Sequence, residues 1–177
     1  MGNSGEIISF VNDLRNYLLE SKALTEAEYE LLQLLADSAR INNTQLATAT
    51  RTAPSTTLNR VNSMLKSNII EGFHTRVNRK ALGLNLQATV SIRLSVQSPE
   101  AIQNTLTDMM KIPYVTSVMK TTGSFHLIVH AYAQDSDSLQ VNVIDPISSI
   151  PLVELTETSL LLSHHRRSSL FGDFYAE

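Results

Sequence analysis

The chain of 177 residues contains no cysteine. This absence excludes a disulfide-stapled scaffold, a thiolate zinc site and cysteine catalysis, and it fits a reducing compartment. Charged residues are also scarce, at 18%, whereas apolar residues make up 42% of the chain. That apolar content is enough for a hydrophobic core and excludes disorder throughout. The length predicts one domain or two small ones.

A long apolar run is missing near the start of the chain. The stretch from Ile7 to Leu19 is interrupted by polar and charged residues, and no basic leader precedes it. We therefore expect no targeting sequence, no membrane span and no membrane partner, and we expect a cytoplasmic protein.

Charge is distributed unevenly along the chain. The net charge is −3, yet residues 38–85 carry seven basic residues and one acidic residue, a net charge of +6 between two acidic flanks. A basic block of this kind predicts an anionic partner, although a solvated helical face would have the same composition.

The first part of the chain has helical periodicity. Residues 6–21 carry one apolar stripe and predict a helix that packs on the protein, with a partner subunit as the expected surface and a loose arm as the alternative. A capping box of Thr25 and Glu28 then begins a second helix, which ends near Ser38. The stripe of the first helix consists of Ile7, Val11, Leu14 and Leu18.

Two further helices complete a helix-turn-helix outline. We expect Asn43 to cap a short helix and Pro54 to occupy the first position of a longer one that ends near Ser67. Asn68 follows at a position where a left-handed residue is favoured. A short helix followed by a longer one is typical of the helix-turn-helix. The expected apolar face of the longer helix consists of Leu58, Val61 and Leu65.

From Leu86 the apolar period changes from helical to two, which predicts a strand with one buried face. The motif Ile-Pro-x-Val occurs at Ile112 and again at Ile150, 38 residues later. This repeat predicts two successive strand-helix-strand units in one sheet, the ferredoxin-like arrangement. Pro146 should bend the second helix or start a new turn. The expected elements are a strand at 86–96, a helix from 98, strands reaching 120 and covering 125–133, a helix at 135–149 and a strand ending near 165.

The order of these parts resembles the Lrp/AsnC transcription regulators. The resemblance covers about residues 24–165 and implies an α+β protein with an N-terminal winged helix-turn-helix domain and a C-terminal ferredoxin-like βαββαβ sensor domain. The resemblance implies a DNA-binding domain at 23–74, a hinge at 75–85 and an effector and oligomerisation domain at 86–167. We expect an extension helix at 1–22 before them and a tail at 168–177 after them. The segments that carry the resemblance are 37–42, Leu46-Ala47, Pro54-Ser55, Leu58, Arg60-Val61, 69–73, Asn78-x-x-x-Leu82-Gly83 and 122–125.

Several positions depart from the pattern of that family. Arg51 occupies the position of the usual turn glycine, so a larger residue must adopt the turn conformation. Ala53 replaces the serine that caps the recognition helix, at a cost of roughly 0.5–2 kcal/mol of helix stability. His126 replaces an acidic residue in the sensor loop. The first helix and the residues after 165 have no counterpart in the family.

Side chains of the helix that begins at Pro54 are the candidates for reading bases in the major groove. An alternative for Arg60 is a salt bridge to Glu28 or Glu30. The residues predicted to bind double-stranded DNA are Arg40, Thr44, Arg51, Ser55, Thr56, Thr57, Asn59, Arg60, Lys66 and Arg76, and Arg79 and Lys80 are further candidates for phosphate contacts.

The resemblance also implies a pocket for a small-molecule effector between the sensor domains of a homodimer or larger oligomer. A loop with exposed N–H groups near Gly123 suits a carboxylate, whereas His126 binds an ammonium group poorly. Because of that substitution, we expect either an effector that is not an ordinary amino acid or no effector at all. The alternative interpretation of the loop is a plain hairpin turn. The predicted effector-binding residues are Thr121, Thr122, Gly123, Ser124, Phe125 and His126.

Catalytic and metal-binding patterns are weak in this sequence. His126 and His130 lie four residues apart on a strand, about 13 Å, and cannot chelate one metal ion. We predict no cofactor and no enzymatic activity, and a DNA-binding transcription regulator as the function. Two alternatives stay open. One is an enzyme that resembles sirohaem decarboxylases and uses His126, His130 and Arg93, and the other is a ligand-binding or scaffold protein with a degraded helix-turn-helix.

Overall fold

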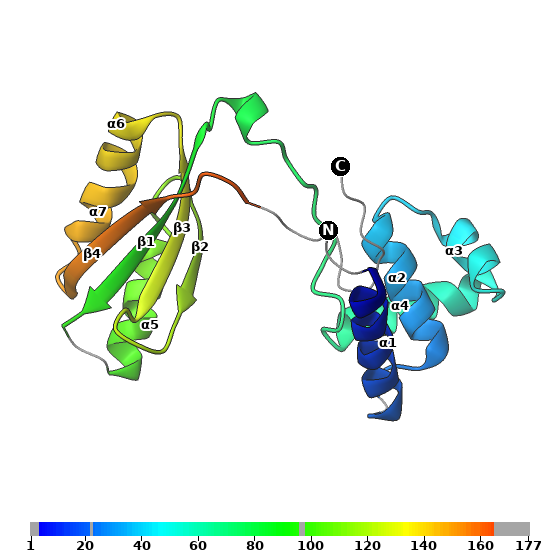
Figure 1. The fold of residues 1–177 in the computed structure, drawn as a ribbon. Helices are drawn as coiled ribbons and strands as arrows, with labels where there is room; N and C mark the ends of the chain where they lie inside the picture. The colour runs from blue at the N-terminus through cyan, green and yellow to red at the C-terminus, as the bar shows by residue number, and fades with distance from the viewer. Residues whose placement is uncertain (1–3, 22, 96–97, 165–177) are drawn as a thin grey trace. The chain divides into compact units, whose positions relative to one another are not determined.

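The computed structural model describes residues 4–21, 23–95 and 98–164 (Figure 1). It divides into two compact units with the boundary between Thr75 and Arg76. We refer to residues 4–75 as the helical unit and to residues 76–164 as the sheet unit. Most of the expected hinge, 75–85, therefore belongs with the sheet, and the expected tail, 168–177, lies outside the described residues. In the described part of the chain, no helix is both long and apolar enough to cross a membrane.

The helical unit surrounds a small apolar core. Tyr29, Leu31 and Met64 are almost completely buried in it, and Leu18 of the first helix packs against it. The side chains of Ile7 and Val11 lie outside the described part, so only half of the expected stripe is visible. The helices of this unit are α1 (Ser4–Glu20), α2 (Glu26–Asp37), α3 (Asn43–Ala49) and α4 (Pro54–Lys66).

Side-chain caps fix the starts of α2 and α3. The capping box of Thr25 and Glu28 is confirmed. The predicted cap of α3 is wrong by one residue, because the cap is Asn42. Asn42 Oδ1 accepts the Gln45 N–H, and Gln45 Oε1 accepts the Asn42 N–H. Asn43 instead donates from Nδ2 to the carbonyl oxygen of Pro54 at 2.8 Å. The second asparagine therefore ties α3 to the beginning of α4.

The buried face of α4 is rotated from the expected one. Thr57 and Met64 are fully buried, whereas Leu58, expected in the core, is 50% exposed. Val61 remains half-buried and packs against the core, as the apolar pattern predicts. Pro54 at the first helical position is confirmed, and Asn68 after the helix has φ +59°, the left-handed conformation predicted for it. Residues 71–78 then run without a regular element.

The sheet unit is a four-stranded antiparallel sheet in the order β2-β3-β1-β4, which confirms the ferredoxin-like topology (Figure 1). Each Ile-Pro-x-Val copy leads into an edge strand. In the first, Val115 N–H donates to Ile112 O, and in the second, Val153 N–H donates to Ile150 O. The elements are a 3₁₀ turn η1 (Lys80–Leu82), β1 (Leu86–Leu94), α5 (Pro99–Met109), β2 (Val115–Lys120), β3 (Leu127–Ala133), α6 (Ser136–Leu139), a π-helical turn η2 (Gln140–Ile144), α7 (Asp145–Ser148) and β4 (Val153–Leu160).

Alternate residues of β1 and β3 form one apolar face of the sheet. Val90, Ile92 and Val129 are fully buried there against side chains of α5 and of the α6–α7 segment. Both helical segments therefore cover the same face. The segment predicted as one helix at 135–149 is divided by η2, and Pro146 begins a new turn as expected.

Candidate DNA interface and sensor loop

The turn between α3 and α4 is formed by a residue in an unfavourable conformation. Arg51 has φ +51°, which confirms that a residue larger than glycine adopts the turn conformation here. The left-handed region costs a non-glycine residue about 1–2 kcal/mol. The side chain of Arg51 is exposed, so its charge is presented to solvent at the entrance to α4.

The first turn of α4 has no side-chain cap, as the alanine at its N-cap predicts. Ala53 makes no capping hydrogen bond, and Pro54 follows it. Backbone N–H groups at an uncapped helix end are ready donors to an anion such as a phosphate. Ser55, Thr56 and Asn59 are exposed on this part of the helix. The structure therefore brings an exposed cation, an uncapped helix end and three polar side chains together.

Thr57 is a correction to the predicted DNA-binding set. Its side chain is fully buried, and its hydroxyl donates to the carbonyl oxygen of Ala53 at 3.2 Å. The same hydroxyl lies 2.7 Å from Thr52 Oγ1. A side chain without exposed surface cannot contact DNA, so the prediction that Thr57 reads a base is wrong.

Arg60 faces the interior of the helical unit more than the surface. It is half-buried, and its Nη1 is buried without a hydrogen-bond partner among the described residues. The pKa of Glu28 is lowered, first by hydrogen bonds from Thr25 and then by the positive charge of Arg60. The arginine therefore lies near α2, but among the described residues it forms no ion pair with Glu28 or Glu30, so neither its salt-bridge alternative nor base contact is shown.

The remaining residues predicted to contact DNA are solvent-exposed. Arg79, a further candidate for a phosphate contact, is instead engaged by Tyr132. The guanidinium of Arg79 stacks 4.1 Å from the centre of the Tyr132 ring and donates to the Tyr132 hydroxyl at 3.1 Å. This contact belongs to the sheet unit and could not be seen in the local sequence, because the two residues are 53 positions apart. The exposed residues of the prediction are Arg40, Thr44, Arg51, Ser55, Thr56, Asn59, Lys66 and Arg76.

The sensor loop connects β2 to β3 and is closed by its own hydrogen bonds. Thr121 donates its N–H to His126 O at 2.9 Å and its hydroxyl to Phe125 O at 2.7 Å. Gly123 has φ +118°, which confirms the positive φ expected of it. The structure thus brings the six predicted effector residues into one tight turn whose tip, 122–124, is exposed.

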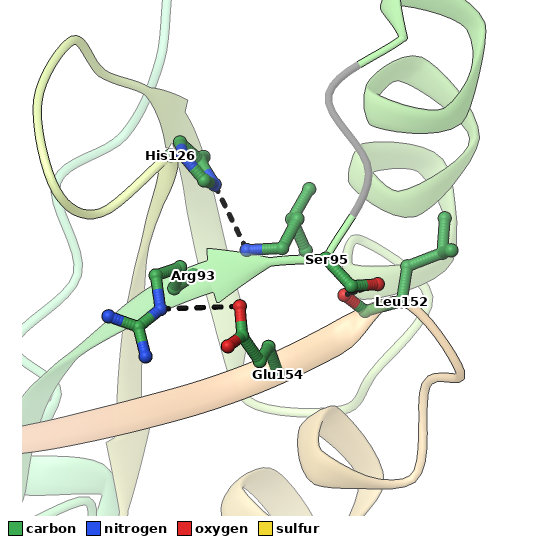
Figure 2. Close-up of polar contacts among 6 residues, drawn as sticks. Arg93, Ser95, His126, Leu152 and Glu154 are labelled. Carbon is green, nitrogen blue, oxygen red and sulfur yellow. Dashed lines mark hydrogen bonds and ion pairs between the residues drawn. The ribbon is translucent and has the colours of Figure 1, made fainter.

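His126 is bonded within the sheet (Figure 2). Its Nδ1 accepts the Leu94 N–H at 3.0 Å, at a register shift of the β1–β4 ladder. A backbone donor on Nδ1 requires that this nitrogen be unprotonated, so the neutral ring carries its proton on Nε2. At the same end of the sheet, Arg93 Nε lies 3.3 Å from a carboxylate oxygen of Glu154.

A second polar cluster occupies the other face of β1 and β3. Gln87 Nε2 lies 2.6 Å from His130 Nε2 and 3.1 Å from His164 Nδ1. Burial lowers the pKa of His130, and the charges of His164 and Arg79 lower it further. This cluster could not be identified from the sequence, because its members come from strands or strand ends that are far apart along the chain. Among the described residues, no group of three or more His, Asp or Glu could hold a metal ion.

A helix-turn-helix unit joined to a ferredoxin-like unit defines a DNA-binding regulator with a ligand-binding half. The family model for winged helix-turn-helix DNA-binding domains matches residues 24–71, and that for the Lrp/AsnC ligand binding domain matches residues 87–171. The chain belongs to the Lrp/AsnC family of transcription regulators.

Similar proteins share most of the chain. The transcriptional regulator AldR of Mycolicibacterium smegmatis is 31% identical over 85% of this chain and 88% of its own, and AzlB of Bacillus subtilis is 30% identical over 82% and 92%. The crystal structure of AldR of Mycobacterium tuberculosis has 28% identity and a TM-score of 0.66 over 81% of this chain and 97% of that one. AsnC of E. coli has 26% identity and a TM-score of 0.71 over 80% and 93%.

A regulator of Neisseria meningitidis with the same fold was solved in complex with L-Met. It is 22% identical, with a TM-score of 0.74 over 81% of this chain and 93% of that one. The relatives that are named as regulators establish the function at the level of the family. The present chain is a DNA-binding transcription regulator.

Proposed function

We propose that α4 enters the major groove of duplex DNA and reads bases with Ser55, Thr56 and Asn59. The observation that carries this proposal is the exposure of these side chains beside an uncapped helix end and an exposed Arg51. Hydroxyl and amide groups hydrogen-bond to base edges, and asparagine pairs with adenine through two bonds. The phosphate contacts come from exposed residues that lie before α3, within α3 and α4, in the turn between them and after α4, namely Arg40, Thr44, Arg51, Lys66 and Arg76.

The test is the dependence of DNA affinity on salt. Duplexes are first selected from a random library with the full-length chain, and the association constant is then measured from low to high salt. We expect a linear fall of log K with log salt concentration, because phosphate contacts release counterions. Lys66→Gln should reduce the slope by about one. Lys120→Gln, an exposed lysine of the sheet unit, is the matched control and should leave the slope unchanged. Equal slopes for both variants would remove Lys66 from the interface.

We also propose that two copies associate through the face of the sheet that α5 and α6–α7 leave open. This face carries exposed apolar side chains, with Met119 46% and Leu155 42% exposed. An isologous contact would cover them in both copies. The molar mass from light scattering should be that of a dimer or larger, and Leu155→Glu should shift it toward the monomer. A monomeric wild type at micromolar concentration would contradict this part.

The sensor loop is proposed to bind a small metabolite that has a carboxylate or phosphate and lacks a free amine. His126 supports this ligand class, because its Nδ1 is occupied and its remaining ring nitrogen is a donor. A donor binds a carboxylate, whereas the ammonium of an amino acid such as L-Met needs an acceptor. Calorimetry against the twenty amino acids and a panel of organic acids tests the preference. We expect organic acids to bind and His126→Asp to gain amino-acid binding. Tight leucine or methionine binding by the unaltered chain would overturn it.

We infer that the sheet unit has no catalytic role. The three residues of the enzyme alternative are each held by a different internal partner, His126 by the Leu94 N–H, His130 by Gln87 and Arg93 by Glu154. A tetrapyrrole-processing enzyme would retain a coloured substrate or product. The visible spectrum of the protein mixed with sirohaem tests this inference, and a shifted, saturable absorbance band would contradict it.

A further inference from the structure

A line of threonine hydroxyls runs through the turn between α3 and α4. Thr50 Oγ1 lies 2.9 Å from Leu46 O and 3.0 Å from Thr52 Oγ1. Thr52 Oγ1 lies 2.7 Å from Thr57 Oγ1, which lies 3.2 Å from Ala53 O. Thr50 and Thr57 are buried and Thr52 is half-buried. We call Thr50, Thr52 and Thr57 the threonine relay.

Three hydroxyl protons serve four oxygen–oxygen contacts in the relay, so the four cannot all be hydrogen bonds at once. The carbonyls at the two ends of the relay, Leu46 O and Ala53 O, each already accept a backbone N–H at 3.0 Å, from Thr50 and Thr57 respectively. Two arrangements leave every hydroxyl bonded in one direction. The hydroxyls donate either from Thr50 through Thr52 and Thr57 to the carbonyl of Ala53, or from Thr57 through Thr52 and Thr50 to the carbonyl of Leu46. Aligned hydroxyl bonds polarise and strengthen one another.

The relay lies where the turn lacks its usual stabilisation. Ala53 provides no cap for α4, and Arg51 holds a left-handed conformation between Thr50 and Thr52. Each of these features weakens the connection between the two helices. A buried hydroxyl without a partner would weaken it further, because its lost hydration is not replaced. The relay supplies that partner for each hydroxyl and links the end of α3, the turn and the first turn of α4.

We propose that Thr57 is a positioning residue for DNA binding. It has no contact with solvent, and it acts through Thr52 and Thr50 to hold the first turn of α4 against α3. That connection sets the direction of the exposed side chains that follow Pro54, and it fixes the backbone on both sides of Arg51. DNA affinity therefore depends on a hydroxyl that DNA cannot reach.

The test compares two substitutions that separate the hydroxyl from the shape of the side chain. Thr57→Val keeps the shape and removes the hydroxyl, whereas Thr57→Ser keeps the hydroxyl. In the full-length chain, at a temperature well below unfolding, Thr57→Val should bind a duplex selected by the wild type about threefold to tenfold more weakly. Thr57→Ser should restore most of the loss. Thr105→Val is the matched control, because Thr105 is also buried and donates to the carbonyl four residues earlier, in α5 of the other unit.

A second measurement does not depend on DNA. Hydrogen–deuterium exchange of the backbone amides in residues 50–60 should be faster in Thr57→Val than in the wild type, and Thr57→Ser should restore the slow exchange. Should Thr57→Val fail to fold, Thr52→Val tests the same link at a half-buried position and should weaken DNA binding in the same direction. Wild-type affinity and exchange in Thr57→Val would overturn the proposal. Equal losses in Thr57→Val and Thr57→Ser would show that packing, not the hydroxyl, is required.

Discussion

Among the side chains that the structure describes, the core cluster of the sheet unit contains thirteen buried apolar residues and that of the helical unit contains seven. The sheet unit is therefore held mainly by apolar packing between strands and helices. Polar bonds connect the helices of the helical unit beside this smaller core: capping boxes at Thr25 and Asn42, the link from Asn43 to Pro54 and the threonine relay.

This difference is consistent with the different functions proposed for the two units, DNA binding and ligand binding. The proposed contact of α4 with DNA requires that one side of this helix stay exposed, so the helical unit has less surface to bury. Hydrogen bonds within turns hold its geometry without covering that side. We expect apolar truncations to damage the sheet unit most, and the loss of single polar groups to damage the helical unit most.

The largest effect is expected from Ile92→Ala in the sheet unit. Ile92 is fully buried under the helices, so its truncation leaves a cavity and should lower the unfolding free energy by about 2–5 kcal/mol. Urea denaturation followed by circular dichroism measures the change, with Val141→Ala at a 62% exposed position as the control. The transition of the helical unit should not move. An equal shift in both transitions would mean that the two units unfold together and would break the comparison.

Arg51→Gly should change stability and function in opposite directions. Glycine adopts φ +51° without strain, so the helical unit should gain about 1 kcal/mol of unfolding free energy. The same substitution removes a proposed phosphate contact and should weaken DNA binding. Thermal unfolding and DNA titration of one sample separate the two effects. A glycine variant that binds DNA as well as the wild type would show that Arg51 serves no contact.

Leu18→Ala tests whether α1 belongs to the helical unit. Leu18 is half-buried against the core, and its truncation should cost about 1 kcal/mol. Tyr17→Ala on the same helix, 67% exposed, is the control. Deletion of residues 1–22 should lower the melting temperature in the same direction. Unchanged melting in both the substitution and the deletion would show that α1 contributes nothing.

The smallest effect concerns the pH dependence of the sheet unit. The pKa of His130 is lowered by burial and by its cationic neighbours, so the unfolded chain takes up this proton at a higher pH than the folded one. Stability should therefore fall as the pH drops below about 6.5, the pKa of a free histidine. His130→Gln should flatten that fall. If the variant keeps the full wild-type pH dependence of stability, groups other than His130 cause that dependence.

Local rules predicted those features that depend on neighbouring residues. The box of Thr25 and Glu28, the left-handed Asn68 and the new turn at Pro146 each follow from residues close in sequence. The topology of the sheet followed from the spacing of the Ile-Pro-x-Val repeat. The cap of α3 was misplaced because two asparagines are adjacent, although Gln45, three residues after Asn42, marks the correct one.

The face of α4 could not be predicted from hydrophobicity alone. The apolar pattern placed Leu58 in the core and Thr57 at the surface, and the structure has the reverse. Thr57 can be buried because its hydroxyl is bonded to Thr52, a partner that no apolar scale records. The same limit applies to Arg60, whose proximity to Glu28 depends on the packing of α4 against α2.

The central claim, that α4 reads bases, is tested most directly by Asn59→Ala in the full-length chain. Its affinity should be compared on a duplex selected by the wild type and on an unselected duplex at the same salt concentration. We predict a loss of about 1–3 kcal/mol on the selected duplex and almost none on the unselected one, because a base contact carries sequence information and a phosphate contact does not. Equal losses on both duplexes, or no loss on either, would contradict the claim.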